Sequence, residues 1–260
     1  SGLWVVADGM GGHEFGEWAS AVIVNMVGRA PLPGDFDQAC GAVADSIHAS
    51  NAAIWREAET RGTQMGSTVV AMLVRDDRFA ILWVGDSRAY LLRDGALVQL
   101  TKDHSQVQAL VDRGVIDEAA AAGHPMSHVL ARAVGVQPEV EVDAIADVAL
   151  PGDIFLLCSD GLSGPVSDAQ IAQELAGGDV VAATDRLIAL TLEAGAPDNV
   201  TVVVLRAQEP TNFVAQPSEP SAAGPTWPPP DAGPTGPDAI GGQDDSVDWG
   251  GGDDRRGIGS

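Results

Sequence analysis

Positive charge is scarce in this sequence. There are 14 Lys and Arg residues against 37 Asp and Glu, which gives a formal net charge of -23. Non-specific binding to nucleic acid or to an anionic membrane surface depends on clustered basic side chains. The composition therefore argues against both kinds of partner, and we expect no nucleic acid to bind.

Cysteine and long apolar runs are also scarce. Cys40 lies at an apolar helical position and Cys158 lies inside an apolar run, where cysteine behaves as a small buried apolar residue. We interpret neither as a nucleophile nor as half of a disulfide, which favours a cytoplasmic location. No run approaches the roughly 20 apolar residues of a membrane-spanning helix, so we expect no membrane span.

The composition changes abruptly near residue 207. More than half of the 16 prolines come after this point, with Gly, Ser and Asp between them and no apolar periodicity. Such a segment cannot bury enough apolar surface to offset its chain entropy. We therefore predict one folded domain over residues 1–206 and a disordered tail over residues 207–260.

The most informative stretch is VADGMGGH, residues 6–13. Residues 3–7 form a short apolar run that predicts a buried strand. The glycines after Asp8 permit a sharp turn, and from Phe15 onward the apolar spacing becomes helical. The pattern presents the carboxylate of Asp8 at the end of a strand.

Three more acidic residues occupy similar positions. Asp86 and Asp160 each follow an apolar run, and Asp198 stands just before one. If the strands pair in one or two sheets, the carboxylates converge and repel one another unless a cation joins them. Oxygen ligands without paired Cys or His favour a hard ion, Mg²⁺ or Mn²⁺, over zinc. The residues thus predict a metal site.

The remaining patterns predict helices around closely spaced hairpins. We expect a long helix from a cap at Asp35 or Asp37 to near Gly62, with further helices near 105–113, 167–175 and 180–194. Strands are expected over 68–74, 79–84, 89–92, 96–100, 140–145, 154–159 and 200–205. Closely spaced hairpins favour an α+β fold over alternating βαβ units.

Seven short motifs occur together and in a fixed order. They are VADGMGGH, MGST at 65–68, VGDSR at 84–88, DHS at 103–105, HP at 124–125, CSDG at 158–161 and DN at 198–199. In the order of these motifs, the sequence resembles the bacterial type 2C (PPM) metal-dependent serine/threonine protein phosphatases over roughly residues 3–206. The resemblance implies two packed, mainly antiparallel β-sheets flanked by helices, with a flap at about 103–136 that influences substrate choice.

The resemblance also implies an activity, the hydrolysis of phosphoserine and phosphothreonine. In our hypothesis Asp8 bridges two Mn²⁺ or Mg²⁺ ions, the Gly9 carbonyl ligates one of them, and Asp160 and Asp198 hold the second. A hydroxide shared by the two ions then attacks phosphorus in line. Asp8, Asp160 and Asp198 are therefore the predicted catalytic residues.

Other parts of the site are less determined by the resemblance. Asp86 resembles the family's ligand for a third, weaker metal, although Gly164 stands where a second acidic ligand is usual. His104 and His124 each have a structural interpretation near a turn, and His124 also has a functional one, contact with substrate or leaving group. We expect a monomer that acts on phosphorylated proteins, the substrates of a bacterial kinase.

The start of the chain departs from the family pattern. In the family, a strand or two with an Arg and an Asn-Glu-Asp segment precedes the VADG strand, which here begins at residue 3. We interpret the chain as truncated at its N-terminus, without the Arg that would dock the substrate phosphate. A binding module that keeps the fold without turnover therefore remains the alternative function.

Overall fold

The computed structural model describes residues 2–121, 124–126, 129–196 and 198–209, and these fall within the compact unit that residues 1–211 form. The predicted tail lies outside the described residues from residue 210 onward. The helices are α1 (His13–Gly28), α2 (Phe36–Arg61), α3 (Gln106–Asp112), α4 (Glu118–Ala121), α5 (Asp160–Ser163), α6 (Asp168–Leu175) and α7 (Val180–Glu193). The strands are β1 (Gly2–Val6), β2 (Gly9–Met10), β3 (Gly66–Ser67), β4 (Val69–Arg75), β5 (Arg78–Val84), β6 (Arg88–Arg93), β7 (Ala96–Gln99), β8 (Asp143–Val148), β9 (Ile154–Cys158) and β10 (Val202–Arg206).

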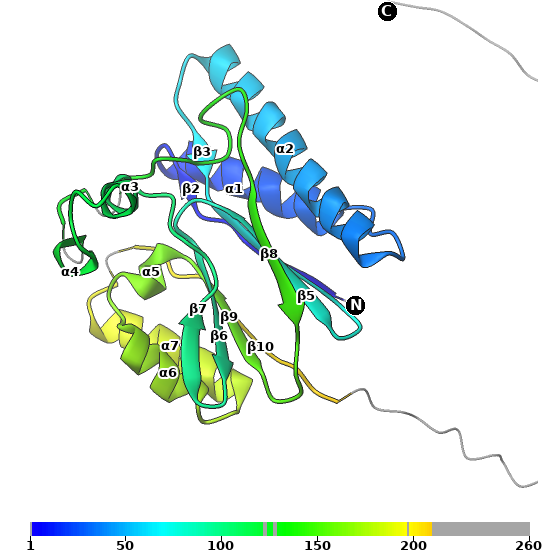
Figure 1. The fold of residues 1–260 in the computed structure, drawn as a ribbon. Helices are drawn as coiled ribbons and strands as arrows, with labels where there is room; N and C mark the ends of the chain where they lie inside the picture. Colours follow the sequence, from blue (N-terminus) through cyan, green and yellow to red (C-terminus); the bar gives the residue numbers. More distant parts are fainter. Residues whose placement is uncertain (1, 122–123, 127–128, 197, 210–260) are drawn as a thin grey trace, which may run out of the picture. The chain divides into compact units, whose positions relative to one another are not determined.

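Two four-stranded sheets form the centre of this unit (Figure 1). One has the strand order β1-β4-β5-β8 and the other β10-β9-β6-β7, and neighbouring strands are antiparallel throughout. Helices α1 and α2 cover the outer face of the first sheet, while α5, α6 and α7 cover the second. The predicted α+β sandwich of two sheets flanked by helices is confirmed.

Side chains of β4 alternate between two separate cores. Val69, Ala71 and Leu73 pack with α1 and α2. Val70 and Met72 pack in the core between the two sheets, against residues of β9. Because both faces of the strand are covered, its sequence is a continuous apolar run instead of an alternation of apolar and polar residues. The same double burial makes this strand a rigid support for the loops at its ends.

The ends of the elements follow from local chemistry. The Asp35 carboxylate accepts a hydrogen bond of 2.9 Å from the Gln38 amide and caps α2, which decides between the two predicted caps. Helix α2 ends at Gly62 in the left-handed conformation, with φ of 60°, as expected for a C-terminal glycine. Among the described residues, none of the helices is long and apolar enough to span a bilayer.

The position of β8 corrects one prediction. The sequence pattern predicts a strand over 140–145, but the strand runs from Asp143 to Val148. Its register is set by antiparallel pairing with β5, in which Asp143 lies opposite Trp83. Val140 is buried in the core beneath α1 and α2 instead, so its apolar character reflects packing of the chain before the strand begins.

Both cysteines are free thiols, in agreement with the sequence. Cys158 is buried within β9, and burial raises the pKa of its thiol to about 12. Cys40 is half-buried on α2. A thiol that holds its proton at neutral pH is a poor nucleophile, so Cys158 acts as a small apolar residue of the core.

Candidate metal centre

Thr68 fixes the backbone of Asp8 immediately after β1. The Asp8 amide donates to Thr68 Oγ1 at 3.0 Å, and the Thr68 amide donates to the Asp8 carbonyl at 2.8 Å. Thr68 Oγ1 also lies 2.6 Å from Ser87 Oγ. One buried hydroxyl therefore joins the strand end that carries Asp8 to the turn that carries Asp86.

Gly9 is packed against the first turn of α1. A Cβ atom on Gly9 would overlap the carbonyl oxygen of Gly16, and a Cβ atom on Gly16 would come within 2.7 Å of the Gly9 carbonyl oxygen. Only glycine permits this close backbone approach. The pattern of glycines after Asp8, recognised in the sequence as a turn, thus also brings the helix close to the site.

Asp160 lies between two residues, Ser159 and Gly161, that contact the loop of Asp198. Ser159 donates its amide to the Thr201 carbonyl at 3.1 Å, and its Oγ accepts from the Thr201 amide at 3.1 Å. On the other side, a Cβ atom on Gly161 would overlap the carbonyl oxygen of Asn199. These contacts place the first residue of α5 beside the loop that precedes β10.

The electrostatics show that the four predicted acids lie near one another. Burial raises the pKa of Asp8 to about 7, and the charge of Asp160 and a hydrogen bond with its carboxyl add to the rise. Asp198 and Asp86 raise the pKa of Asp8 further. The pKa of Asp86 is also raised to about 7, first by burial and then by the charges of Asp160 and Asp103.

This donor set fits a hard divalent cation. Clustered carboxylates in a partly buried site oppose one another's ionisation, and a bound proton or a bound cation relieves that repulsion. Among the residues that the structure describes, no three Asp, Glu, His or Cys side chains already stand in coordinating positions. The charge effects place the four acids within electrostatic reach of one another, and their all-oxygen chemistry suits Mg²⁺ or Mn²⁺.

The two histidines have different surroundings. His104 is buried, accepts a hydrogen bond from the Gly85 amide at Nδ1, and has Nε2 at 3.2 Å from Asp143 Oδ2. Burial, and then the charge of Arg132, lower its pKa, so the ring is neutral and structural. His124 Nδ1 accepts from the Met126 amide at 3.2 Å. That contact is local to a turn, and the functional interpretation of His124 stays a prediction.

The sequence analysis assigned no role to two residues that position the acids. Thr68 and Ser159 belong to quoted motifs, MGST and CSDG, but their hydroxyls carry no acid or base chemistry that marks them out. Their partners, Ser87 and Thr201, lie 19 and 42 residues away along the chain. A small hydroxyl residue next to a strand-end acid is the signal that would have singled them out.

A comparison with known protein families shows which family this chain belongs to. Residues 1–199 match the family described as Protein phosphatase 2C. This chain belongs to the protein phosphatase 2C family. The resemblance inferred from the seven motifs is confirmed.

Several bacterial members of the protein phosphatase 2C family are similar in sequence. The serine/threonine protein phosphatase PstP of Mycobacterium tuberculosis is 42% identical over 204 residues, which cover 78% of this chain and 40% of PstP. The serine/threonine phosphatase stp of Listeria monocytogenes is 34% identical over 212 residues, 77% of this chain and 82% of the relative. This chain therefore spans less than half the length of the mycobacterial relative.

Solved structures of the family have the same fold. A crystal structure of Mycobacterium tuberculosis PstP/Ppp has a TM-score of 0.73 at 42% identity, covering 80% of this chain and 88% of the solved one. The PstP catalytic domain solved in complex with two manganese ions has a TM-score of 0.71 at 40% identity, with 80% and 88% covered. That PstP catalytic domain thus binds two manganese ions.

Proposed function

We propose that this protein phosphatase 2C chain is a metal-dependent serine/threonine protein phosphatase. The observation that carries the proposal is that Asp160, Asp198 and Asp86, each at a separate strand end, lie close enough to the partly buried Asp8 for their charges to raise its pKa. Relatives from several bacteria are named serine/threonine phosphatases. The substrates we propose are phosphorylated proteins that carry phosphoserine or phosphothreonine.

We assign the metal ligands from the residues that converge. Asp8 and the Gly9 carbonyl, with Asp160 and Asp198, would hold two Mn²⁺ or Mg²⁺ ions, and Asp86 would serve a third. Bound divalent cations supply a hydroxide near neutral pH and stabilise negative charge on a phosphate. The solved manganese complex of a relative supports this choice of ion.

The chain's own contribution is to hold these oxygens in place. Thr68 fixes the backbone on either side of the Asp8 carboxylate, and Ser159 ties the Asp160 strand end to the Asp198 loop. Asp8 and Asp86 have pKa values of about 7 without a cation. Because ligands must be deprotonated, cation binding would displace their protons and strengthen as the pH rises.

The wider organisation completes the proposal. Residues 1–206 would form the catalytic domain, and residues 103–136 would form a flap beside the site, from which His124 would contact the substrate. We propose a monomer that works in the cytoplasm on the substrates of a bacterial kinase. The tail over 207–260 would be a linker.

The deciding experiment is Mn²⁺-dependent hydrolysis of a phosphothreonine peptide. We expect Asp8→Asn and Asp160→Asn each to reduce turnover by about 100-fold or more, since each removes a charged metal ligand. Asp153→Asn is the matched control, because Asp153 is buried and paired with Arg93 at the far end of β6. Near-normal turnover in either site variant would contradict the assignment. Binding of Mn²⁺ by the wild type without any turnover would favour the binding module instead.

A further inference from the structure

The turn that carries Asp86 is held on both sides by two consecutive residues, Asp103 and His104. This turn, residues 85–87, joins β5 to β6. On the side before Asp86, the His104 amide donates to the Gly85 carbonyl at 2.9 Å and the Gly85 amide donates to His104 Nδ1 at 3.1 Å. Gly85 is thus bound through both of its backbone polar groups.

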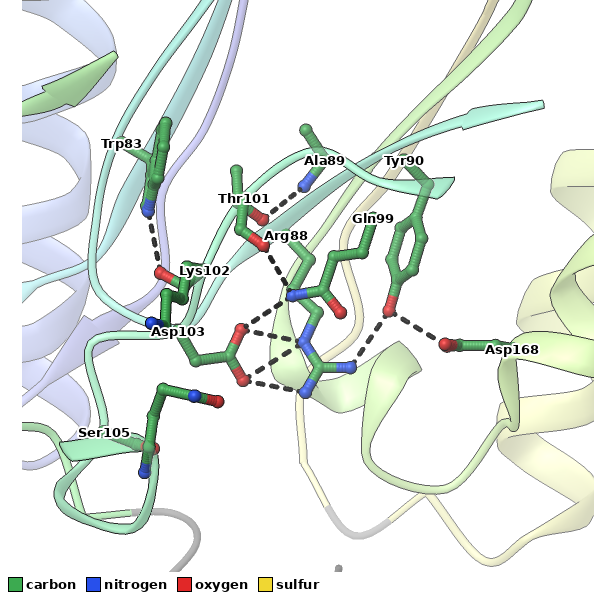
Figure 2. Close-up of polar contacts among 11 residues, drawn as sticks. Trp83, Arg88, Ala89, Tyr90, Gln99, Thr101, Lys102, Asp103, Ser105 and Asp168 are labelled. Carbon is green, nitrogen blue, oxygen red and sulfur yellow. Dashed lines mark hydrogen bonds and ion pairs between the residues drawn. The ribbon is translucent and has the colours of Figure 1, made fainter. Parts of the chain in front are cut away.

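On the side after Asp86, Arg88 is bound by the neighbouring residue. Figure 2 shows the Asp103 carboxylate facing the Arg88 guanidinium, with Nε donating to Oδ1 at 2.9 Å and Nη2 donating to Oδ2 at 2.7 Å. The remaining guanidinium nitrogen, Nη1, donates to Tyr90 Oη at 3.0 Å, and Tyr90 donates to Asp168 at 3.2 Å. A bidentate pair of this kind fixes orientation as well as distance.

The two gripping residues are themselves fixed from several directions. The Trp83 indole donates to the Lys102 carbonyl at 2.9 Å, and the His104 ring stacks on Trp83 with a centroid separation of 6.1 Å. Gln99 donates to Asp103 Oδ1 at 3.3 Å. Asp103 and His104 therefore act as a rigid support for the turn, and we call them the 103–104 clamp.

The clamp also joins the two ends of the predicted flap. The His104 carbonyl accepts a hydrogen bond of 2.7 Å from the Ala131 amide. Arg132 then donates to Asp143 Oδ1 at 2.7 Å, and Asp143 Oδ2 lies 3.2 Å from His104 Nε2. A displacement of either flap end would therefore strain His104, one of the two residues that hold the Asp86 turn.

We propose that Asp103 and His104 are positioning residues that hold the Asp86 carboxylate beside those of Asp8 and Asp160. Neither residue is among the metal ligands proposed above. Their action is exerted through Gly85 and Arg88. This inference rests on the proposed function in one respect, namely that Asp86 is a ligand of a metal ion.

The other end of β6 offers a matched control. Arg93 forms the same bidentate pair with Asp153, with Nε–Oδ1 at 2.9 Å and Nη2–Oδ2 at 2.6 Å. The side chains of Arg88 and Arg93 are 25% and 28% exposed. Arg88→Lys and Arg93→Lys each keep the positive charge but lose the planar fork. The two variants therefore separate positioning of Asp86 from general stabilisation of the strand.

The test measures amide hydrogen exchange in the metal-free protein and Mn²⁺ affinity by calorimetry. In Arg88→Lys we expect exchange in residues 85–88 to be about 10-fold faster and the weakest Mn²⁺ affinity to fall about 10-fold. Arg93→Lys should change neither. In an Asp86→Asn background, Arg88→Lys should have no further effect on Mn²⁺ binding.

A second pair of variants tests the histidine half of the clamp. In His104→Asn the side-chain amide oxygen takes the place of Nδ1 as the acceptor for the Gly85 amide. In His104→Gln the side-chain amide reaches the place of Nε2 instead, so the Gly85 amide loses its acceptor. We expect His104→Asn to retain more of the Mn²⁺ affinity and the slow exchange of residues 85–88.

The outcomes distinguish this inference from the proposed function. Unchanged exchange and affinity in Arg88→Lys, or equal effects in Arg88→Lys and Arg93→Lys, would overturn the clamp while leaving the metal site intact. A wild-type protein that binds no Mn²⁺ would overturn the proposed function. In that case the exchange of residues 85–88 would still decide whether Asp103 and His104 hold the turn.

Discussion

Replacing Asp86 with Asn should stabilise the metal-free protein at alkaline pH. The Asp86 side chain is buried, with 8% of the residue exposed, and burial followed by the charges of Asp160 and Asp103 raises its pKa from 3.8 to about 7. Because folding raises this pKa, the carboxyl favours the folded state only while it is protonated. That contribution is complete below about pH 4 and is lost as the pH rises through 7.

The size of the effect follows from the pKa shift. A shift of about three units corresponds to about 4 kcal/mol at 1.36 kcal/mol per unit. Water penetration and relaxation of the turn reduce such penalties, so we expect Asp86→Asn to raise the free energy of unfolding by about 1–3 kcal/mol at pH 8. For a domain of this size that is a rise in Tm of about 3–10 °C.

Thermal unfolding in EDTA at pH 5 and pH 8 measures this difference. Because the contribution begins to be lost above the unfolded pKa of 3.8, wild type and Asp86→Asn should differ less than half as much at pH 5 as at pH 8. Added Mn²⁺ should favour the wild type. Asp153→Asn should instead lower the free energy of unfolding at pH 8. Burial alone would raise the pKa of Asp153, but its hydrogen bonds with Arg93 lower that pKa overall, so the ionised form stabilises the fold. A metal-free Asp86→Asn protein less stable than wild type at pH 8 would refute the reasoning.

Two further changes test the supports of the site. Gly161→Ala should destabilise the fold by about 2 kcal/mol or more and reduce turnover, because its methyl group would overlap the Asn199 carbonyl oxygen. Gly177→Ala should behave like wild type in both assays, because its methyl group would lie 3.7 Å from the Glu174 carbonyl oxygen. Thr68→Val should lower the free energy of unfolding in urea by about 1–3 kcal/mol, because the Asp8 amide and the Ser87 hydroxyl lose their common partner. Thr68→Ser should restore most of that loss, and a Val variant as stable as the Ser variant would show that the hydroxyl is unimportant.

Short-range patterns in the sequence were enough for the elements, the family and the candidate acids. Apolar runs that end in Asp8, Asp86 and Asp160 mark strand ends, because a buried strand must stop where a charge and turn residues begin. The short hairpins between β4 and β5 and between β6 and β7 turn at Asp76 and Asp94, whose φ angles are 54° and 51°. Each of these features depends on neighbours within a few residues.

Only the tertiary structure decided which distant groups meet. The strand over 140–145 was predicted too early because its register depends on pairing with β5, more than 50 residues away along the chain. The pKa values of about 7 for Asp8 and Asp86 come from burial and from charges on other strand ends. The 103–104 clamp likewise joins residues 15 and 19 positions apart. Local sequence chemistry specifies where a carboxylate leaves its strand, whereas the packing of two sheets specifies what surrounds it.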